Sequence, residues 1–237
     1  MKQVRHHWST LRRAGLLGDK PARQAFRLFR TWPALDYDTV VDLGAHKGEF
    51  TDAARRVLGA RRLVLIEADP ELAEGLRARY AGDESIEVVQ AAVTDRSGPV
   101  QLRINAHRDS SSILPITAEA EKQFRMDMHE VRQVEVPGVT LDELFERYGL
   151  DRVALLKSDI QGAERAMILG GTEALQRVQS IYIEVNFGEF YEGCAQFREL
   201  DEMLGERGFK LRSFHEERLG SDGGLAYANA FYLRVEG

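Results

Sequence analysis

Short runs of β-branched and aliphatic residues alternate along the chain with longer segments in which apolar residues recur at helical spacing. Such alternation is typical of βαβ units and predicts a mostly parallel sheet. Asp69-Pro70 and Thr140, with Glu143 three residues later, are typical helix starts. The expected strands are residues 39–43, 62–67, 86–90, 153–158 and 180–185, and the expected helices are 47–58, two segments that begin at Asp69 and Thr140, 163–169 and 196–206.

The end of the chain has the pattern of a hairpin. Two further strands, 209–214 and 226–235, flank a turn rich in Gly and Ser at 220–224. Such a pair commonly forms an antiparallel edge on a parallel sheet. We therefore predict a doubly wound α/β fold, with a Rossmann-like sheet of seven strands and an antiparallel C-terminal edge.

Residues 105–135 interrupt this alternation. They contain three consecutive serines at 110–112 and a charged, helical stretch near 118–128, between expected strands at 99–104 and 134–136. We expect this insertion to be the variable part that faces the substrate. The whole of 36–237 is predicted to be one domain, since no linker or repeat divides it.

Charge separates the N-terminal segment from the rest of the chain. The net charge is −6, but residues 1–35 hold eight basic side chains and one acid, so the remainder carries −13. A basic arm of this kind can bind nucleic acid, an anionic membrane or an acidic substrate. We favour a helical extension that packs on the domain, because Phe26, Phe29 and Trp32 have roughly helical spacing.

Composition excludes several classes of protein. No apolar run approaches the ~20 residues of a membrane-spanning helix, and the first residues lack the apolar core of a secretion signal. Cys194 is the only cysteine, so an internal disulfide is impossible, which fits a reducing compartment. We expect a cytoplasmic protein.

The most informative segment lies at the end of the first expected strand. Asp42 precedes a turn with Gly44 and Gly48, and Glu67 ends the next strand. Ligands of open α/β sheets bind at the carboxyl ends of strands, where Gly44 permits a close approach and Glu67 can accept hydrogen bonds from ribose hydroxyls.

These features fit NAD or S-adenosylmethionine (SAM), and the spacing decides between them. A dinucleotide requires Gly-x-Gly-x-x-Gly to seat its pyrophosphate, whereas this chain has Gly-x-x-x-Gly. The carboxylate of Asp42 would repel a pyrophosphate and attract the ammonium group of SAM. The pattern therefore favours SAM, with a structural role for Asp42 and Glu67 as the plainer alternative.

A second set of polar residues follows the later strands. Lys157 and Asp159 lie two apart on one face, before a turn at Gly162, and Glu184 and Asn186 end the next strand. Because these strands are neighbours, their polar groups are expected to converge on the edge that bears Asp42 and Glu67. Lys157 is expected to pair with an acid such as Glu184.

On these residues the sequence resembles the FkbM family of methyltransferases over roughly 39–235. The resemblance implies a SAM-dependent fold and methyl transfer to a hydroxyl of a sugar or natural product, so that the partner is a small-molecule or glycan acceptor. It departs from the family at His46, Lys47 and Ser158. The motifs that carry it are Val41-Asp-Leu-Gly-Ala-His-Lys-Gly48, Ile66-Glu-Ala-Asp-Pro70, Thr140-Leu-Asp142, Leu156-Lys-Ser-Asp-Ile-Gln-Gly-Ala-Glu164 and Ile183-Glu184. The cofactor-binding residues it implies are Asp42, Gly44, Ala45, Gly48 and Glu67, with Ala92 near the adenine. His46, in the same turn, is a further candidate for cofactor binding.

Methyl transfer to an alcohol requires removal of a proton, by a base or with the help of a metal. Asp159 is the first candidate. Three roles are open for it: a general base, a ligand for Mg²⁺ together with Glu184 and Asn186, or a structural residue that orders its loop. His215 is a second candidate base. The other candidates are Lys157 for chemistry and His107 and His129 for facing the acceptor. Phe190 and Tyr191 could form the wall of its pocket, although we favour a packing role for these two aromatic residues.

Three other classes of protein remain open. A non-catalytic SAM-fold module would keep the fold without turnover, and an NAD(P)-binding oxidoreductase would need the glycine triplet that is absent. A nucleic-acid methyltransferase would use the basic arm, but residues 158–161 lack the proline and aromatic residue of a base-methylating loop. The sequence therefore carries no strong nucleic-acid signal, and it does not indicate an oligomeric state.

Overall fold

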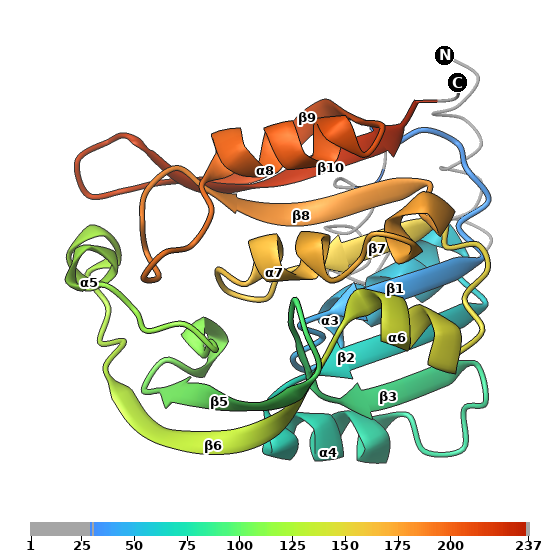
Figure 1. The fold of residues 1–237 in the computed structure, drawn as a ribbon, viewed down its shortest axis with the longest axis horizontal. Coiled ribbons are helices and arrows are strands. Elements are labelled where there is room, and N and C mark those ends of the chain that lie inside the picture. The colour runs from blue at the N-terminus through green and yellow to red at the C-terminus, as the bar shows by residue number, and fades with distance from the viewer. Residues whose placement is uncertain (1–28, 30, 236–237) are drawn as a thin grey trace, which may run out of the picture.

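The computed structural model describes residue 29 and residues 31–235. Its centre is a seven-stranded sheet in the order β3-β2-β1-β7-β8-β10-β9 (Figure 1). Five strands are parallel and the last two are antiparallel, which confirms the predicted fold class. The strands are β1 Thr39–Leu43, β2 Arg62–Glu67, β3 Ile86–Gln90, β7 Leu155–Ser158, β8 Ser180–Asn186, β9 Phe209–Leu219 and β10 Leu225–Arg234.

Helices cover both faces of this sheet. One face carries α6, α7 and α8, whose apolar side chains join one core cluster, and the other face carries α3, its π-helical continuation η2, and α4. The cap of α4 is as predicted, since Asp69 Oδ1 accepts a hydrogen bond from the Glu71 amide at 2.9 Å. The helices are α3 Glu49–Ala53, η2 Ala54–Leu58, α4 Pro70–Arg79, α6 Leu141–Arg147, α7 Glu164–Leu169, the 3₁₀ turn η4 Ala174–Arg177 and α8 Phe197–Glu206.

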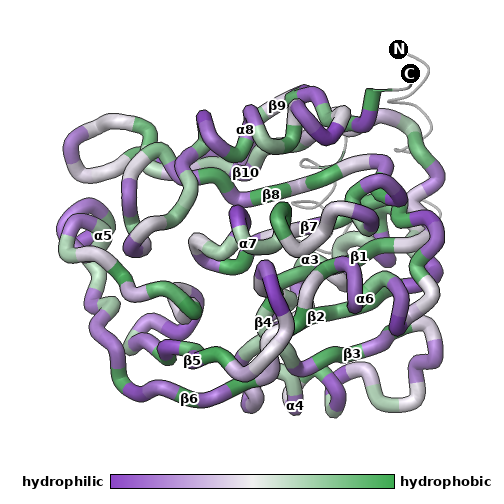
Figure 2. The backbone as a smooth tube through the Cα atoms, in the orientation of Figure 1, coloured by the Kyte–Doolittle hydropathy of each residue, from purple (hydrophilic) through white to green (hydrophobic). Residues whose placement is uncertain are grey.

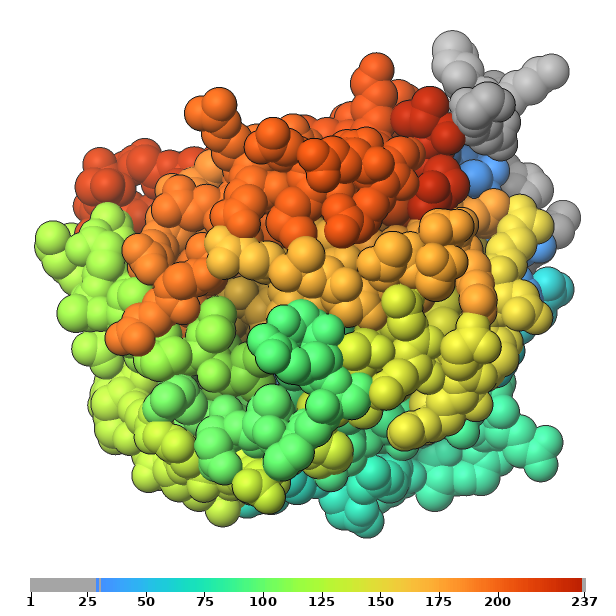
Figure 3. All heavy atoms as spheres, in the orientation of Figure 1, coloured from blue at the N-terminus to red at the C-terminus, as the bar shows by residue number. Residues whose placement is uncertain are grey.

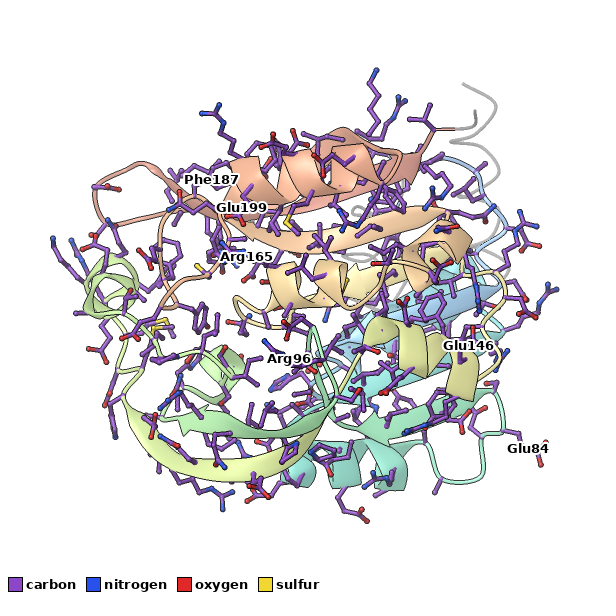
Figure 4. The ribbon with its side chains drawn as sticks, in the orientation of Figure 1. Glu84, Arg96, Glu146, Arg165, Phe187 and Glu199 are labelled. Atoms are coloured by element: carbon purple, nitrogen blue, oxygen red, sulfur yellow. The ribbon has the colours of Figure 1, made fainter. Side chains whose placement is uncertain are left out.

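The helices α7 and α8 lie side by side on the face shown in Figure 3. Figure 4 labels Arg165 of α7 and Glu199 of α8, whose Nε and Oε1 atoms are 2.6 Å apart. Both side chains are partly exposed, so this ion pair contributes at most about 1 kcal/mol to stability. The packing of Leu200 and Leu204 beneath it holds α8 on the sheet.

Strands within residues 92–139, on both sides of the insertion, form a second, three-stranded sheet in the order β4-β6-β5. Strands at 99–104 and 134–136 were predicted, but their pairing in a separate sheet was not. This sheet lies beyond the carboxyl ends of the parallel strands, and α5 lies farther out (Figure 1). A strand near 99–104 and a helix near 118–128 were predicted, and the structure confirms both. The elements are β4 Ala92–Val93, β5 Gly98–Asn105, the 3₁₀ turn η3 Arg108–Ser110, α5 Ala118–Phe124 and β6 Glu130–Val139.

Of the predicted N-terminal extension, residues 1–28 and 30 lie outside the described part of the chain. Phe29 and Trp32 are buried, and the Trp32 ring stacks on Phe231 with centroids 4.4 Å apart. The division into an extension of 1–35 and a domain of 36–237 stays a prediction. In the part of the chain described, no helix is long and apolar enough to cross a membrane.

Candidate functional site

A cavity of about 810 Å³ opens at the carboxyl ends of the central strands. Its walls come from the turn after β1, the ends of β2 and β7, strand β4, and the loop 108–113 of the insertion. A volume of this size is typical of a site for a small molecule or cofactor. The cavity lies where strand order reverses in a doubly wound sheet, which is the expected ligand position.

The turn after β1 brings two loops unusually close together. Gly44 has φ of 71°, and a Cβ atom on it would lie 1.9 Å from the carbonyl oxygen of Asp159. Only glycine fits this contact. At Gly48 a Cβ atom would instead collide with the Tyr80 hydroxyl, at 2.2 Å. Gly44 and Ala45 line the cavity, whereas Gly48 shapes the turn from behind.

Glu67 is a fixed carboxylate in the cavity wall. Oε2 accepts a hydrogen bond from the His46 amide at 2.8 Å, and Oε1 accepts one from the Asp69 amide at 2.9 Å. Burial raises the pKa of Glu67, while these two hydrogen bonds oppose the rise. Each oxygen has a second lone pair, so the carboxylate is preorganised to accept further hydrogen bonds from a ligand.

Small side chains surround the next part of the cavity. Ala68, Ala91 and Ala92 line it at the ends of β2 and β3 and the start of β4. Alanines leave space between the strand ends for a flat ring such as adenine. Ala92 thus lies in the cavity wall, and its place near the adenine stays a prediction.

The structure corrects the predicted role of Asp42. This side chain has no exposed surface and does not line the cavity. Its Oδ2 accepts a hydrogen bond from the Thr51 hydroxyl at 2.8 Å, and its Oδ1 lies 3.2 Å from Lys157 Nζ. Asp42 therefore lies behind the cavity wall and has no surface that a ligand could contact directly. Its positively charged partner is the ammonium group of Lys157, whereas the sequence predicted the ammonium group of SAM.

The ammonium group of Lys157 is held on three sides. It donates to the carbonyls of Leu43 at 3.1 Å and Gly44 at 2.7 Å, and it faces Asp42. Burial lowers the pKa of Lys157, but the carboxylates of Asp42, Asp159 and Glu67 outweigh it, so the net shift is upward. A permanently charged ammonium with these partners is unsuited to proton transfer, against its predicted catalytic role. Its partner acid is Asp42 and not the predicted Glu184.

Asp159 lies at the end of β7 and lines the cavity. Its Oδ1 accepts a hydrogen bond from the Gln161 amide group at 2.6 Å, and its Oδ2 is 4.0 Å from Lys157 Nζ. The side chain is 38% exposed. Asp159 is thus a carboxylate that is oriented by a neighbour and open to the cavity, and its role as a general base stays a prediction.

The predicted Mg²⁺ site is not assembled. Of Asp159, Glu184 and Asn186, only Asp159 lines the cavity, and no cluster of three or more His, Cys, Asp or Glu ligands occurs among the residues that the structure describes. Burial, with Asp159 and Glu164 nearby, raises the pKa of Glu184 well above its ordinary value.

The predicted histidines lie away from the reacting region. His215 does not line the cavity, and its Nε2 is 2.7 Å from the Ser213 hydroxyl. Burial lowers the pKa of His215. His129 is exposed and His107 is partly exposed, and neither lines the cavity.

The predicted aromatic wall has a packing role. Phe190 and Tyr191 are buried beside α5, outside the cavity lining. The Tyr191 hydroxyl donates to the Ser110 carbonyl at 3.2 Å, which ties the insertion to the loop after β8. Cys194 is a buried free thiol in the same cluster.

Sequence reasoning missed two groups of cavity residues. The first is the loop of Arg108 and Asp109, which covers the cavity from the insertion. The second comprises Tyr182, Glu216 and Asn229, which extend the cavity along β8, β9 and β10. These residues come together through the pairing of strands, in which Asn229 lies opposite Glu184. The sequence alone does not show which residues of two strands lie opposite each other.

The chain matches a known family of proteins. Residues 42–211 match the model of the methyltransferase FkbM domain, so the chain belongs to that family. It is a SAM-dependent methyltransferase, as the motifs around Gly44 and Asp159 predicted. The NAD(P)-binding and non-catalytic alternatives are set aside by this assignment.

Two curated relatives are methyltransferases. The chain is 28% identical over 173 residues to the 2-O-methyltransferase NoeI of Sinorhizobium fredii, covering 70% of each protein. It is 33% identical over 109 residues to an ornithine lipid N-methyltransferase of Singulisphaera acidiphila, covering 45% of this chain and 57% of that protein.

Solved structures share the fold at low sequence identity. The N-terminal domain of EvdMO1, with SAH bound, aligns with a TM-score of 0.50 at 12% identity, over 93% of this chain and 83% of that one. The fibrillarin pre-rRNA processing protein of Methanococcus jannaschii aligns with a TM-score of 0.50 at 13% identity, over 86% and 69%.

Proposed function

We propose that this enzyme transfers a methyl group from SAM to a hydroxyl of a sugar or natural product. The observation that carries the proposal is the position of Asp159, a cavity carboxylate on the strand next to the cofactor turn. The relative named as a 2-O-methyltransferase, which matches 70% of the chain, supports a hydroxyl acceptor.

The cavity residues fit the cofactor in three places. Glu67 would accept hydrogen bonds from the ribose hydroxyls, the alanines at 68, 91 and 92 would enclose the adenine, and the turn at Gly44 would hold the methionine portion. Lys157 places a positive charge beside that turn, which suits the carboxylate of the methionine portion. When bound, SAM supplies an electrophilic methyl group on a sulfonium.

Asp159 would remove the proton of the acceptor hydroxyl. Gln161 orients one carboxylate oxygen, so the other is available to the acceptor. Holding the hydroxyl in line with the methyl group contributes roughly 7–11 kcal/mol to lowering the barrier, and proton removal contributes a further 10²–10⁴-fold in rate. No metal is included in this mechanism, because Glu184 and Asn186 lie outside the cavity lining.

The substitution Asp159→Asn tests the assignment. With radiolabelled SAM and a panel of methyl glycosides, we expect kcat/KM to fall by about 10²–10⁴-fold, while the affinity for S-adenosylhomocysteine (SAH) changes less than twofold. Asp95→Asn, at a partly exposed acid outside the cavity lining, is the matched control. Transfer to an amine acceptor and to no glycoside would overturn the hydroxyl assignment.

We also propose a cytoplasmic location. A chain with the single cysteine Cys194, which has no disulfide partner of its own, suits a reducing compartment.

A further inference from the structure

The cavity continues past Asp159 along the edge of the central sheet. Asp159 follows the pair Ser158–Ile183, and Glu184 pairs with Asn229 on β10, which in turn pairs with His215 on β9. Adjacent strands are about 4.8 Å apart, so the far end of this row lies roughly 14 Å from Asp159. The row ends at Glu216, which lines the same cavity.

A β-bulge aims Glu216 into the cavity. Between the pairs with Asn229 and Tyr227, β10 has one intervening residue, whereas β9 has two, Glu216 and Glu217. Glu216 takes the left-handed conformation, with φ of 53°. A non-glycine residue there is strained, and bulges and strain of this kind are concentrated where a side chain is redirected for function.

Two donors hold the carboxylate in place. The Tyr182 hydroxyl donates to Glu216 Oε2 at 2.8 Å, and Asn229 Nδ2 donates to the same oxygen at 3.1 Å. Within the described chain Oε1 has no donor, so it is available to a ligand. A carboxylate that is fixed through one oxygen and presents the other is suited to accept a hydrogen bond from a hydroxyl.

Aromatic rings form the wall between the two carboxylates. Phe50 stacks on Tyr182 with ring centroids 6.0 Å apart, and Phe29 contacts Phe50 edge-on at 5.9 Å. All three line the cavity. A ligand there meets apolar ring faces on one side and hydrogen-bond acceptors at its ends, a pattern that suits the C–H faces and hydroxyls of linked sugar rings.

We propose that Glu216 is an acceptor-binding residue, which accepts a hydrogen bond from a hydroxyl of the part of the acceptor remote from the methylated position. This inference rests on the proposed function and deepens it. Because β8 and β10 lie between β9, which carries Glu216, and β7, which Asp159 follows, we infer that the acceptor is a glycoside of at least two rings instead of a monosaccharide. Tyr182 and Asn229 are positioning residues for Glu216.

The test is ligand-observed NMR on the full-length protein saturated with SAH, with methyl β-maltoside, methyl β-lactoside and methyl β-D-glucoside as probes. We expect a disaccharide to bind more tightly than the glucoside. Glu216→Gln should weaken disaccharide binding about fivefold or more, because a charge-assisted hydrogen bond from the acceptor hydroxyl to the carboxylate is replaced by a weaker neutral one. Tyr182→Phe should weaken the same binding less.

Glu217→Gln is the matched control, at the neighbouring exposed acid of the bulge, and should bind both SAH and disaccharide as the unmodified protein does. Equal disaccharide affinity of the Glu216→Gln variant and the unmodified protein would overturn the inference and leave the proposed function intact. Failure of every glycoside to bind the SAH-loaded protein would overturn both.

Discussion

The buried ion pair of Asp42 and Lys157 connects the cofactor turn to the end of β7. Asp42 is completely buried, and it is also held by Thr51, so its charge depends on both partners. The raised pKa of Lys157 means that the contribution of the pair is fully present below the ordinary lysine pKa and is lost only as the pH rises through the higher native value.

The substitution Lys157→Met removes one partner and leaves Asp42 buried without its counter-charge. We expect the free energy of unfolding to fall by about 3–5 kcal/mol. The double variant Asp42→Asn, Lys157→Met should recover part of that loss. Urea denaturation at pH 7 measures both, and an unchanged midpoint for Lys157→Met would show that the pair does not stabilise the fold.

Glu164 is a buried acid at the start of α7, and burial raises its pKa to about 7. The folded protein therefore holds a proton that the unfolded chain releases, so the free energy of unfolding falls as the pH rises from about 4.5 to 7. Glu164→Gln keeps an acceptor for the Ile160 amide and cannot ionise. We expect it to leave stability unchanged at pH 4 and to raise it by roughly 1–3 kcal/mol at pH 8.

Urea denaturation of the Glu164→Gln variant and the unmodified protein across pH 4–8 measures this difference. Equal stability at both ends of the range would contradict a raised pKa at Glu164.

At the residue scale, the sequence predicted the acids that follow strands directly. Glu67 and Asp159 end apolar runs, and the structure places both in the cavity wall. Glu216 gave no such signal, because a bulge depends on pairing between two strands. The sequence predicted that Asp42 would attract the ammonium group of SAM, whereas it pairs with Lys157. A sequence shows that an acid precedes a turn, but it does not show which positive charge lies next to that acid.

At the element scale, the loop 108–113 is attached to the rest of the site by charged contacts. Arg108 pairs with Asp69 and also with Glu71, whose Oε2 atom is 2.8 Å from Nη1, while His46 Nε2 lies 3.0 Å from Asp109 Oδ1. These contacts bridge from the insertion to α4 and to the turn after β1. They hold the loop in place as one wall of the cavity.

Arg108→Ala should loosen this wall. We expect SAH to dissociate about 5–10 times faster, since an ion pair with the buried Asp69 and a second one with Glu71 are lost. Stopped-flow measurement of SAH release gives the rate. Arg96→Ala, at an exposed arginine of the β4–β5 turn, is the control and should not change the rate. Equal dissociation rates for the two variants would show that Arg108 does not hold the loop in place.

The elements that were predicted with the most accurate bounds are buried strands of the central sheet. The strands β1 and β2 are buried on both faces and read as apolar runs, which Figure 2 shows in green. Strand β6 begins with exposed polar residues, so only its last part was recognisable in the sequence. The second half of β9 is also exposed, so the predicted strand ended at residue 214, before the end of β9.

At the scale of the whole molecule, the order of the strands creates the site. Parallel strands bring the ends of β1, β2 and β7 to one edge, and the small sheet of the insertion lies over that edge (Figure 1). Alternation of strands and helices sufficed to predict the doubly wound fold. The second sheet was not predictable, because β5 and β6 pair across about 25 intervening residues of mixed character.

The most direct test of the account is isothermal titration of the protein with SAH, beside Glu67→Gln and the matched control Glu87→Gln at an exposed acid of β3. Micromolar binding by the unmodified protein and the control, weakened tenfold or more in Glu67→Gln, is the predicted result, since Glu67 holds the turn through the His46 amide and is proposed to bind the ribose. Absence of SAH binding by the unmodified protein, or equal affinity of all three proteins, would contradict a cofactor site built around Glu67.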